Sequence, residues 1–176
     1  EMIARYGKRL HFKVAADGPF FDALHTEQKE YVGEAYNQGG FAPYELYMEA
    51  MHTSDIALLP LRDNLFNRMK SDLKFIEAAG NGAVVLASPT VYQDSIRDGR
   101  TGFLYHDPRE FREWLTVLIE NPMLRCDTAQ LAYRYVKENR LLAQHYEERV
   151  SAYQELKAHL PELERERRLR LARMRR

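Results

Sequence analysis

Two short runs of apolar residues constrain the fold of this chain more than any other feature. They are Asp55–Leu61 and Ala83–Ser88, and in both the apolar residues follow one another almost without a polar break. A strand that is apolar on both sides is typical of a parallel sheet whose two faces are covered by helices. We therefore expect both runs to be buried strands of a parallel sheet.

Two further strands and several helices are predicted around these runs. Leu10–Ala16 alternates apolar and polar residues before a turn signal, and Gly102–Tyr105 is a short fourth strand. Strands that alternate with helices indicate an α/β fold with an open parallel sheet, followed by C-terminal helices. Apolar residues at helical spacing predict helices at Phe20–Ala35, Pro43–Met51, Leu73–Ala79 and Pro108–Ile119, and in two stretches between Pro122 and Leu160. In the second of these helices, the residues expected to face inward are Tyr44, Tyr47, Met48 and Met51.

Composition places the chain among ordinary soluble domains. Of its 176 residues, 45% are hydrophobic and 30% are charged, and 26 basic residues balance 26 acidic ones. The balance gives no general attraction to nucleic acid, and no apolar run approaches the roughly 18 residues of a membrane span. The one cysteine, Cys126, excludes an internal disulfide and suggests a reducing compartment, so we expect a cytoplasmic location.

Positive charge is concentrated at the C-terminal end. We expect Pro161 to open an arginine-rich helix or tail, in which Glu162–Arg176 holds seven arginines against three glutamates. A solvated helix is the first interpretation. The alternative is contact with another subunit or with the inner face of a membrane, because a thin apolar edge runs along the segment at Leu169, Leu171 and Met174.

The loop after the first apolar run gathers charge where a parallel sheet binds its ligands. Such sheets bind ligands at the carboxyl ends of their strands, beside helix N-termini. Ser71 is predicted to be the N-cap of the helix that follows the loop, whose first amides would then form an anion site. Three basic residues of the loop add positive charge beside it: Arg62, Arg68 and Lys70.

Two charged residues, Lys74 and Glu77, interrupt the otherwise apolar pattern of this helix. Residues three positions apart share one face of a helix. A charge near the core must be paired or hydrogen-bonded to be tolerated. Spacing alone therefore leaves two interpretations open, a mutual ion pair and a polar ligand.

Four pieces of sequence follow one another in a specific order. They are a strand, a helix with a Glu-Ala step, a second strand and an Asp-Gly turn, at Asp55–Pro60, Lys74–Gly82, Ala83–Ser88 and Asp98–Leu104. Their order and spacing resemble the C-terminal, donor-binding domain of the retaining GT-B glycosyltransferases of the group 1 or family 4 type. The resemblance implies a Rossmann-like three-layer domain, a nucleoside-diphosphate sugar as donor, and an N-terminal acceptor-binding domain in the same parent protein.

The resemblance also implies roles for single residues. Glu77 is similar to the glutamate that binds the ribose hydroxyls, a role that suits a carboxylate because it accepts from both. Amides at Ser71–Leu73 would receive the diphosphate or the sugar, and Lys70 and Lys74 would bind phosphate. The family often has a second glutamate eight positions before the first, where this chain has Met69. The predicted donor-binding residues are Asn67, Arg68, Lys70, Ser71, Asp72, Leu73, Lys74 and Glu77.

The predicted activity is the transfer of a sugar to an unknown acceptor in glycan or glycolipid biosynthesis, without a metal or an organic cofactor. Residues 1–160 are predicted to be one partial domain, whose first strand lies upstream of Glu1, and 161–176 to be the tail. We expect the chain alone to bind a nucleoside diphosphate weakly and to transfer nothing. The alternative, which Met69 favours, is a non-catalytic interaction module derived from such a domain.

Two features near the predicted site can be explained by local structure without a role in ligand binding. Gly99 and Gly102 are predicted to allow a tight turn before the last strand. Thr90 and Tyr92 either border the donor pocket or only begin a helix. The six histidines lack metal-ligand spacing.

Overall fold

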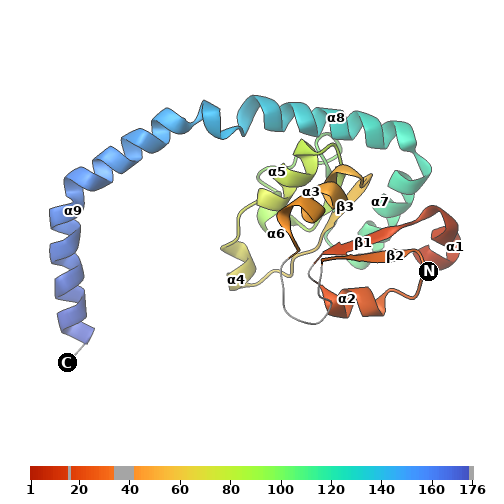
Figure 1. Ribbon diagram of the computed structural model, residues 1–176, viewed down its shortest axis with the longest axis horizontal. Coiled ribbons are helices and arrows are strands. Elements are labelled where there is room, and N and C mark those ends of the chain that lie inside the picture. The colour runs from red at the N-terminus through yellow and green to blue at the C-terminus, as the bar shows by residue number, and fades with distance from the viewer. Residues whose placement is uncertain (16, 34–41, 175–176) are drawn as a thin grey trace. The chain divides into compact units, whose positions relative to one another are not determined.

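The computed structural model describes residues 1–15, 17–33 and 42–174 and shows strands alternating with helices (Figure 1). The chain divides into two compact units, Glu1–Lys137 and Glu138–Arg176. Every strand that the structure describes lies in the first unit, and every strand pairing is parallel. The predicted α/β class is confirmed.

The strands form two hydrogen-bonded sheets. In the first, β1 (Phe12–Ala15) pairs with β2 (Lys29–Val32). In the second, the order is β3 (Ile56–Leu59), β4 (Val84–Ala87) and β5 (Phe103–Leu104). The two apolar runs are therefore neighbouring strands. The sequence predicts one open sheet, whereas the described strands are divided between these two.

The largest departure from the sequence prediction is strand β2. Helical spacing predicts one helix from Phe20 to Ala35, but α2 (Gly18–Ala23) is short and Lys29–Val32 is extended. The strand contains aromatic and β-branched residues, which fit a sheet well, and β1 supplies its hydrogen bonds. Tertiary pairing thus overrides the local helical pattern. Ala35 lies outside the described residues.

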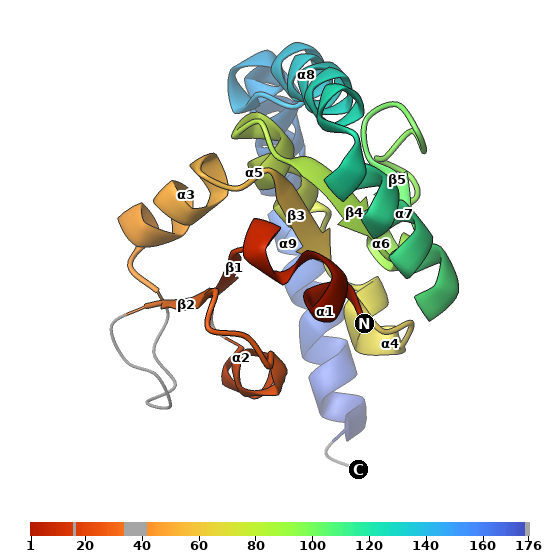
Figure 2. The same cartoon turned by 90° about the vertical axis from the view of Figure 1, so that its right-hand side faces the viewer.

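Helices cover both faces of the β3–β4–β5 sheet (Figure 2). The residues of β4 are all buried and belong alternately to two apolar clusters. One cluster joins the strand to α5 and α8, and the other joins it to α1 and α7. This two-sided burial is the reason why the Ala83–Ser88 run is continuously apolar. The bounds of these helices are α1 Met2–Tyr6, α5 Leu73–Gly80, α7 Pro108–Glu120 and α8 Pro122–Asn139.

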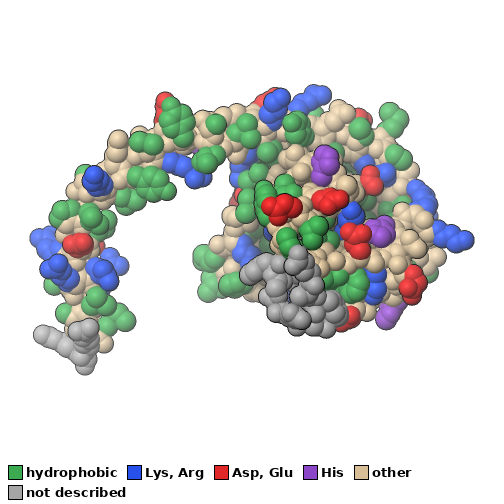
Figure 3. Space-filling view, viewed as in Figure 1, with side chains coloured by type: hydrophobic (Ala, Val, Ile, Leu, Met, Phe, Trp, Pro, Cys, Tyr) green, Lys and Arg blue, Asp and Glu red, His purple; other side chains and the backbone are tan. Residues whose placement is uncertain are grey.

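Helix α3 (Tyr44–His52) lies beside α5 and presents a half-buried face to it. Tyr47, Met48 and Met51 are partly buried, as predicted, but Tyr44 is 67% exposed and was wrongly placed on the inner face. Figure 3 shows acidic side chains on the outer side of this helix. Position 44 begins the helix directly after Pro43, ahead of the turns that contact α5.

The tight turn before β5 is confirmed. Gly99 has φ +71°, a left-handed conformation that glycine adopts without strain. At Gly102, an added Cβ would lie 3.2 Å from the carbonyl oxygen of Val85. The Asp98 carboxylate accepts a hydrogen bond from the Leu104 amide at 2.8 Å and ties the turn to the strand.

The second unit consists largely of one helix, α9 (Tyr146–Met174), which follows the short η2 turn (Leu142–Gln144). Pro161 lies inside α9 and does not open a helix, which corrects the sequence prediction. None of the α9 residues that the structure describes is buried. Arginines and apolar side chains alternate along its exposed surface (Figure 3). No helix in the described part of the chain is long and apolar enough to cross a membrane.

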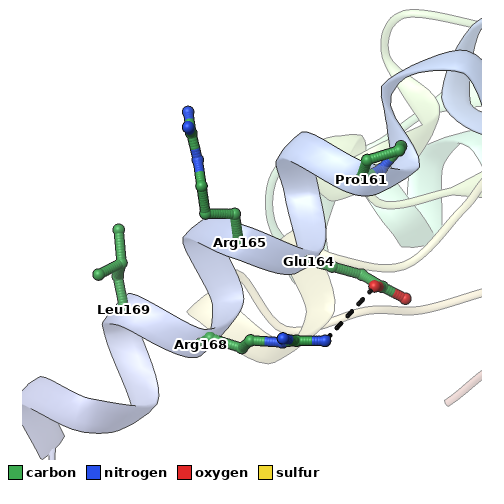
Figure 4. Close-up of a pocket in the computed structure, with 5 residues that line it drawn as sticks. All are labelled: Pro161, Glu164, Arg165, Arg168 and Leu169. Carbon is green, nitrogen blue, oxygen red and sulfur yellow. Dashed lines mark ion pairs between the residues drawn. The ribbon is translucent and has the colours of Figure 1, made fainter.

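A shallow hollow of about 340 Å³ lies beside Pro161 on α9 (Figure 4). It is lined by side chains from successive turns of one helix, and Glu164 and Arg168 form an ion pair of 4.0 Å across it. A hollow along a single exposed helix has no opposing wall. It therefore does not enclose a ligand.

Candidate functional site

The loop between β3 and α5 starts at the carboxyl edge of the sheet. The register pairs Leu59 with Ala87, so β3 and β4 end side by side. Just beyond, the Leu61 amide donates to Ser88 Oγ at 2.8 Å, and Thr90 Oγ1 donates to the Leu61 carbonyl at 3.1 Å. These bonds hold the start of the loop at the edge where parallel sheets bind ligands.

The neighbouring Tyr92 is a core residue. It ends the short helix α6 (Pro89–Tyr92) and lies in the core, with 3% of its surface exposed. Burial raises the pKa of its phenol.

The side chains of two predicted site residues form hydrogen bonds to other residues of the loop. Arg68 donates two hydrogen bonds to Asp63, at 2.5 and 2.7 Å, and this contact lowers the pKa of the carboxyl. The Asn67 side chain donates to the Arg62 carbonyl at 2.9 Å. Both side chains therefore stabilise the loop around the short helix α4 (Leu65–Arg68). A role for them in donor binding stays a prediction.

The end of the loop exposes one cation and several apolar side chains. The Lys70 ammonium lies 5.0 Å from the ring centroid of Phe66, and its side chain is exposed. Met69, at the position where the resembled family has a second glutamate, is 76% exposed. The loop therefore offers positive charge but no carboxylate at this position.

Helix α5 begins at Leu73, as predicted, but its N-cap residue differs from the predicted one. Asp72, not Ser71, is its N-cap residue, and no side chain caps the helix. Asp72 is as good a capping residue as serine, but its carboxylate accepts a hydrogen bond from the Ser95 hydroxyl instead. The Phe75 amide makes the first helical bond, to the Asp72 carbonyl at 2.9 Å. The amides of the two preceding helical residues lie at the positive end of the helix, which attracts anions.

Lys74 and Glu77 do meet, and Tyr47 from α3 joins them. Lys74 Nζ lies 3.0 Å from Glu77 Oε2 and 2.7 Å from the Tyr47 hydroxyl oxygen. The Tyr47 hydroxyl donates to the same carboxylate oxygen at 2.7 Å. The ammonium also lies 4.2 Å from the centre of the Tyr47 ring. We call these three residues the Tyr47–Lys74–Glu77 cluster. Its mutual ion pair is one of the two interpretations that the spacing left open.

Tyr47 is the residue that sequence reasoning missed as part of the site. The pattern placed it on the inner face of α3 and treated it as packing. The signal was its hydroxyl, because a buried tyrosine usually finds a hydrogen-bond partner.

The environment of the cluster sets its protonation at neutral pH. Burial raises the pKa of Tyr47, so the phenol keeps its proton. Burial alone would lower the pKa of Lys74, but its hydrogen bonds to Tyr47 and Glu77 outweigh burial and raise it. The Glu77 side chain is 21% exposed and that of Lys74 is 50% exposed. The cluster is therefore a neutral phenol, a cation and a carboxylate that solvent can still reach.

A sequence profile of the glycosyl transferase-like family matches residues 1–155. The chain belongs to this glycosyl transferase-like family. The match contains both sheets and the Tyr47–Lys74–Glu77 cluster, and it ends inside α9 before the arginine-rich residues. The family resemblance inferred from the four sequence pieces is thereby confirmed.

One solved structure to which this chain is similar is the C-terminal domain of a glycosyl transferase group 1 family protein (LpcC) from Francisella tularensis. The two chains are 21% identical, with a TM-score of 0.48, and the alignment covers 64% of this chain and 54% of the other. The glycosyl transferase-like chain thus spans about half of the length of that chain. No curated protein sequence matches it.

Among the eight predicted site residues, the structure brings the side chains of Lys74 and Glu77 into direct contact. The other six lie along the loop and the start of α5 at the same edge of the sheet: Asn67, Arg68, Lys70, Ser71, Asp72 and Leu73. Their arrangement offers a carboxylate, two lysines and the amides of a helix start to a ligand.

Proposed function

We propose that this glycosyl transferase-like domain binds the nucleoside-diphosphate part of a sugar donor at the start of α5. The observation that carries the proposal is the Tyr47–Lys74–Glu77 cluster. Its carboxylate is held in a defined place and stays partly open to solvent. A carboxylate accepts hydrogen bonds from two neighbouring hydroxyls at once, which suits the diol of a ribose.

The diphosphate has its own complementary groups nearby. The first amides of α5 lie at the positive end of the helix. Two cations lie close to them in the sequence, Lys70 just before the helix and Lys74 in its first turn. Lysines can neutralise phosphate oxygens, so the proposal requires no metal ion. It requires no organic cofactor either.

In this proposal, transfer depends on a second domain of the parent protein. That domain would supply the acceptor site, and the domain described here would hold the donor and stabilise the charge that grows on the departing diphosphate. The lysines and the amides at the start of α5 are the groups placed for that task. We propose that the reaction keeps the sugar's configuration and takes place in the cytoplasm.

Calorimetric titration of the chain with UDP, GDP and ADP tests the proposal. We expect weak binding of at least one of them, and the same affinity within about twofold when EDTA is present, since a tenfold change would signal about 1.4 kcal/mol of lost interaction. The absence of binding to all three would contradict the proposed donor site. A loss of binding in EDTA would contradict only its independence of metal.

A second candidate function rests on Met69. Its side chain is 76% exposed beside Leu65 and Phe66, which are 73% and 75% exposed. An apolar surface in place of a sugar-binding carboxylate fits a domain that contacts another protein without catalysing transfer. Assays of sugar transfer by the parent protein would decide between the two functions.

A further inference from the structure

We propose that Tyr47 is a positioning residue for ribose recognition, which it serves by fixing the orientation of the Glu77 carboxylate. This inference rests on the proposed function. It adds a residue from a different helix, α3, to a site whose other members belong to α5 and the loop before it.

The direction of each hydrogen bond in the cluster follows from chemistry. The Lys74 ammonium can only donate, and the ionised Glu77 carboxylate can only accept. The Tyr47 hydroxyl accepts from the ammonium at 2.7 Å, so its single proton is directed to the carboxylate, also at 2.7 Å. The phenol therefore forms a bridge with one defined polarity.

The ion pair alone does not fix the carboxylate. Lys74 is half exposed, and exposed ion pairs between flexible side chains contribute little and hold no single geometry. Tyr47 is different, because its ring is partly buried and is attached to a separate helix packed on α5. It supplies a fixed reference point outside the helix that carries Glu77.

Both described hydrogen bonds of the carboxylate end on Oε2. This arrangement occupies one oxygen with protein donors, and neither of these bonds uses the other oxygen, Oε1, which the proposal assigns to the ribose. A ribose diol then meets an acceptor whose orientation is set before binding, so little rotational freedom is lost on binding. Without the hydroxyl of Tyr47, the carboxylate would keep its charge but lose this orientation.

The substitution Tyr47→Phe tests the inference, since it removes the hydroxyl and keeps the ring that lies against Lys74. The full chain is titrated with a ribonucleoside diphosphate and with its 2′,3′-dideoxy analogue. We expect the unsubstituted chain to prefer the ribose form by about tenfold, as for a hydrogen-bonded pair involving a charge. In Tyr47→Phe we expect this preference to fall below about threefold, with the affinity for the dideoxy form unchanged.

Two further variants separate positioning from a structural effect. Tyr44→Phe is the matched control on the same helix, where the side chain is 67% exposed, and it should keep the full preference. Glu77→Gln should lose the preference, and adding Tyr47→Phe to it should cause no further loss, because both act through one interaction.

Each other outcome overturns the inference in a recognisable way. A preference that survives in Tyr47→Phe contradicts the role of Tyr47 and leaves the proposed function standing. If Tyr47→Phe loses affinity for the ribose form and for the dideoxy form to the same extent, the role of Tyr47 is purely structural. An unsubstituted chain that binds neither ligand overturns the inference together with the proposed function.

Discussion

At the scale of single residues, the Tyr47–Lys74–Glu77 cluster combines charge, burial and exposure in one place. Two charges on a mostly apolar helix are tolerated because each is paired and because a phenol from another helix bridges them. The same contacts make the cluster sensitive to alkaline pH.

Stability should fall as the pH rises above about 10, and Tyr47→Phe should reduce that fall. The pKa of Lys74 is raised from 10.5, so its stabilising charge is complete below 10.5 and is lost as the pH rises through the folded-state value. The pKa of Tyr47 is raised from 10.0, so above 10.0 the unfolded chain releases this proton first and folding is disfavoured. Thermal unfolding between pH 7 and pH 11 measures both. An identical alkaline profile in Tyr47→Phe would contradict the assignment.

At the scale of elements, burial decides which aromatic residues stabilise the fold. Phe75 on α5 has no exposed surface and contacts Tyr135 of α8, with ring centroids 6.1 Å apart. Phe66 on α4 is 75% exposed. The two offer a matched pair, since the same substitution can be made at both positions.

Phe75→Ala should lower the free energy of unfolding by about 3–5 kcal/mol, because it leaves a cavity between α5 and the sheet. Phe66→Ala should change it by less than about 0.5 kcal/mol, as is usual for exposed positions. Chemical denaturation measures both values. Equal effects would show that the packing of α5 against β4 and α8 is not as described.

The sequence predicts elements well where one pattern has one explanation. The apolar run Ala83–Ser88 is typical of a strand covered on two sides, and β4 is such a strand. Prediction fails where a distant contact decides. Strand β2 exists through its pairing with β1, and Asp72 becomes the N-cap with its carboxylate turned to Ser95. The partnership of Tyr47 with α5 is of the same kind, because residues 30 positions apart meet only in the folded chain.

At the scale of the whole molecule, the chain has two units, and the family match covers the first completely but the second only in part. The family match ends at residue 155, and the arginine-rich residues continue α9 beyond it. The domain boundary predicted at residue 160 and the role of the tail stay predictions. The apolar edge of the tail is exposed, at Leu169, Leu171 and Met174.

Removing residues 161–176 should leave nucleoside-diphosphate affinity unchanged within about twofold, because the contacts of the cluster lie in the first unit. Titration of the full and shortened chains measures this, and a large loss would place the tail in the donor site. The same two chains test the proposed membrane contact. Binding of only the full chain to vesicles with anionic lipid, weakened by salt, would support it.

A titration of Glu77→Ala tests directly whether Glu77 holds the donor nucleotide. Glu113→Ala is the control, since Glu113 is an exposed glutamate paired with Arg109 on α7. We expect Glu77→Ala to weaken nucleoside-diphosphate binding by about tenfold or more, through lost hydrogen bonds to a charged acceptor, and Glu113→Ala to bind as the unsubstituted chain does. Equal affinity of the unsubstituted chain and Glu77→Ala would contradict a role of Glu77 in donor binding.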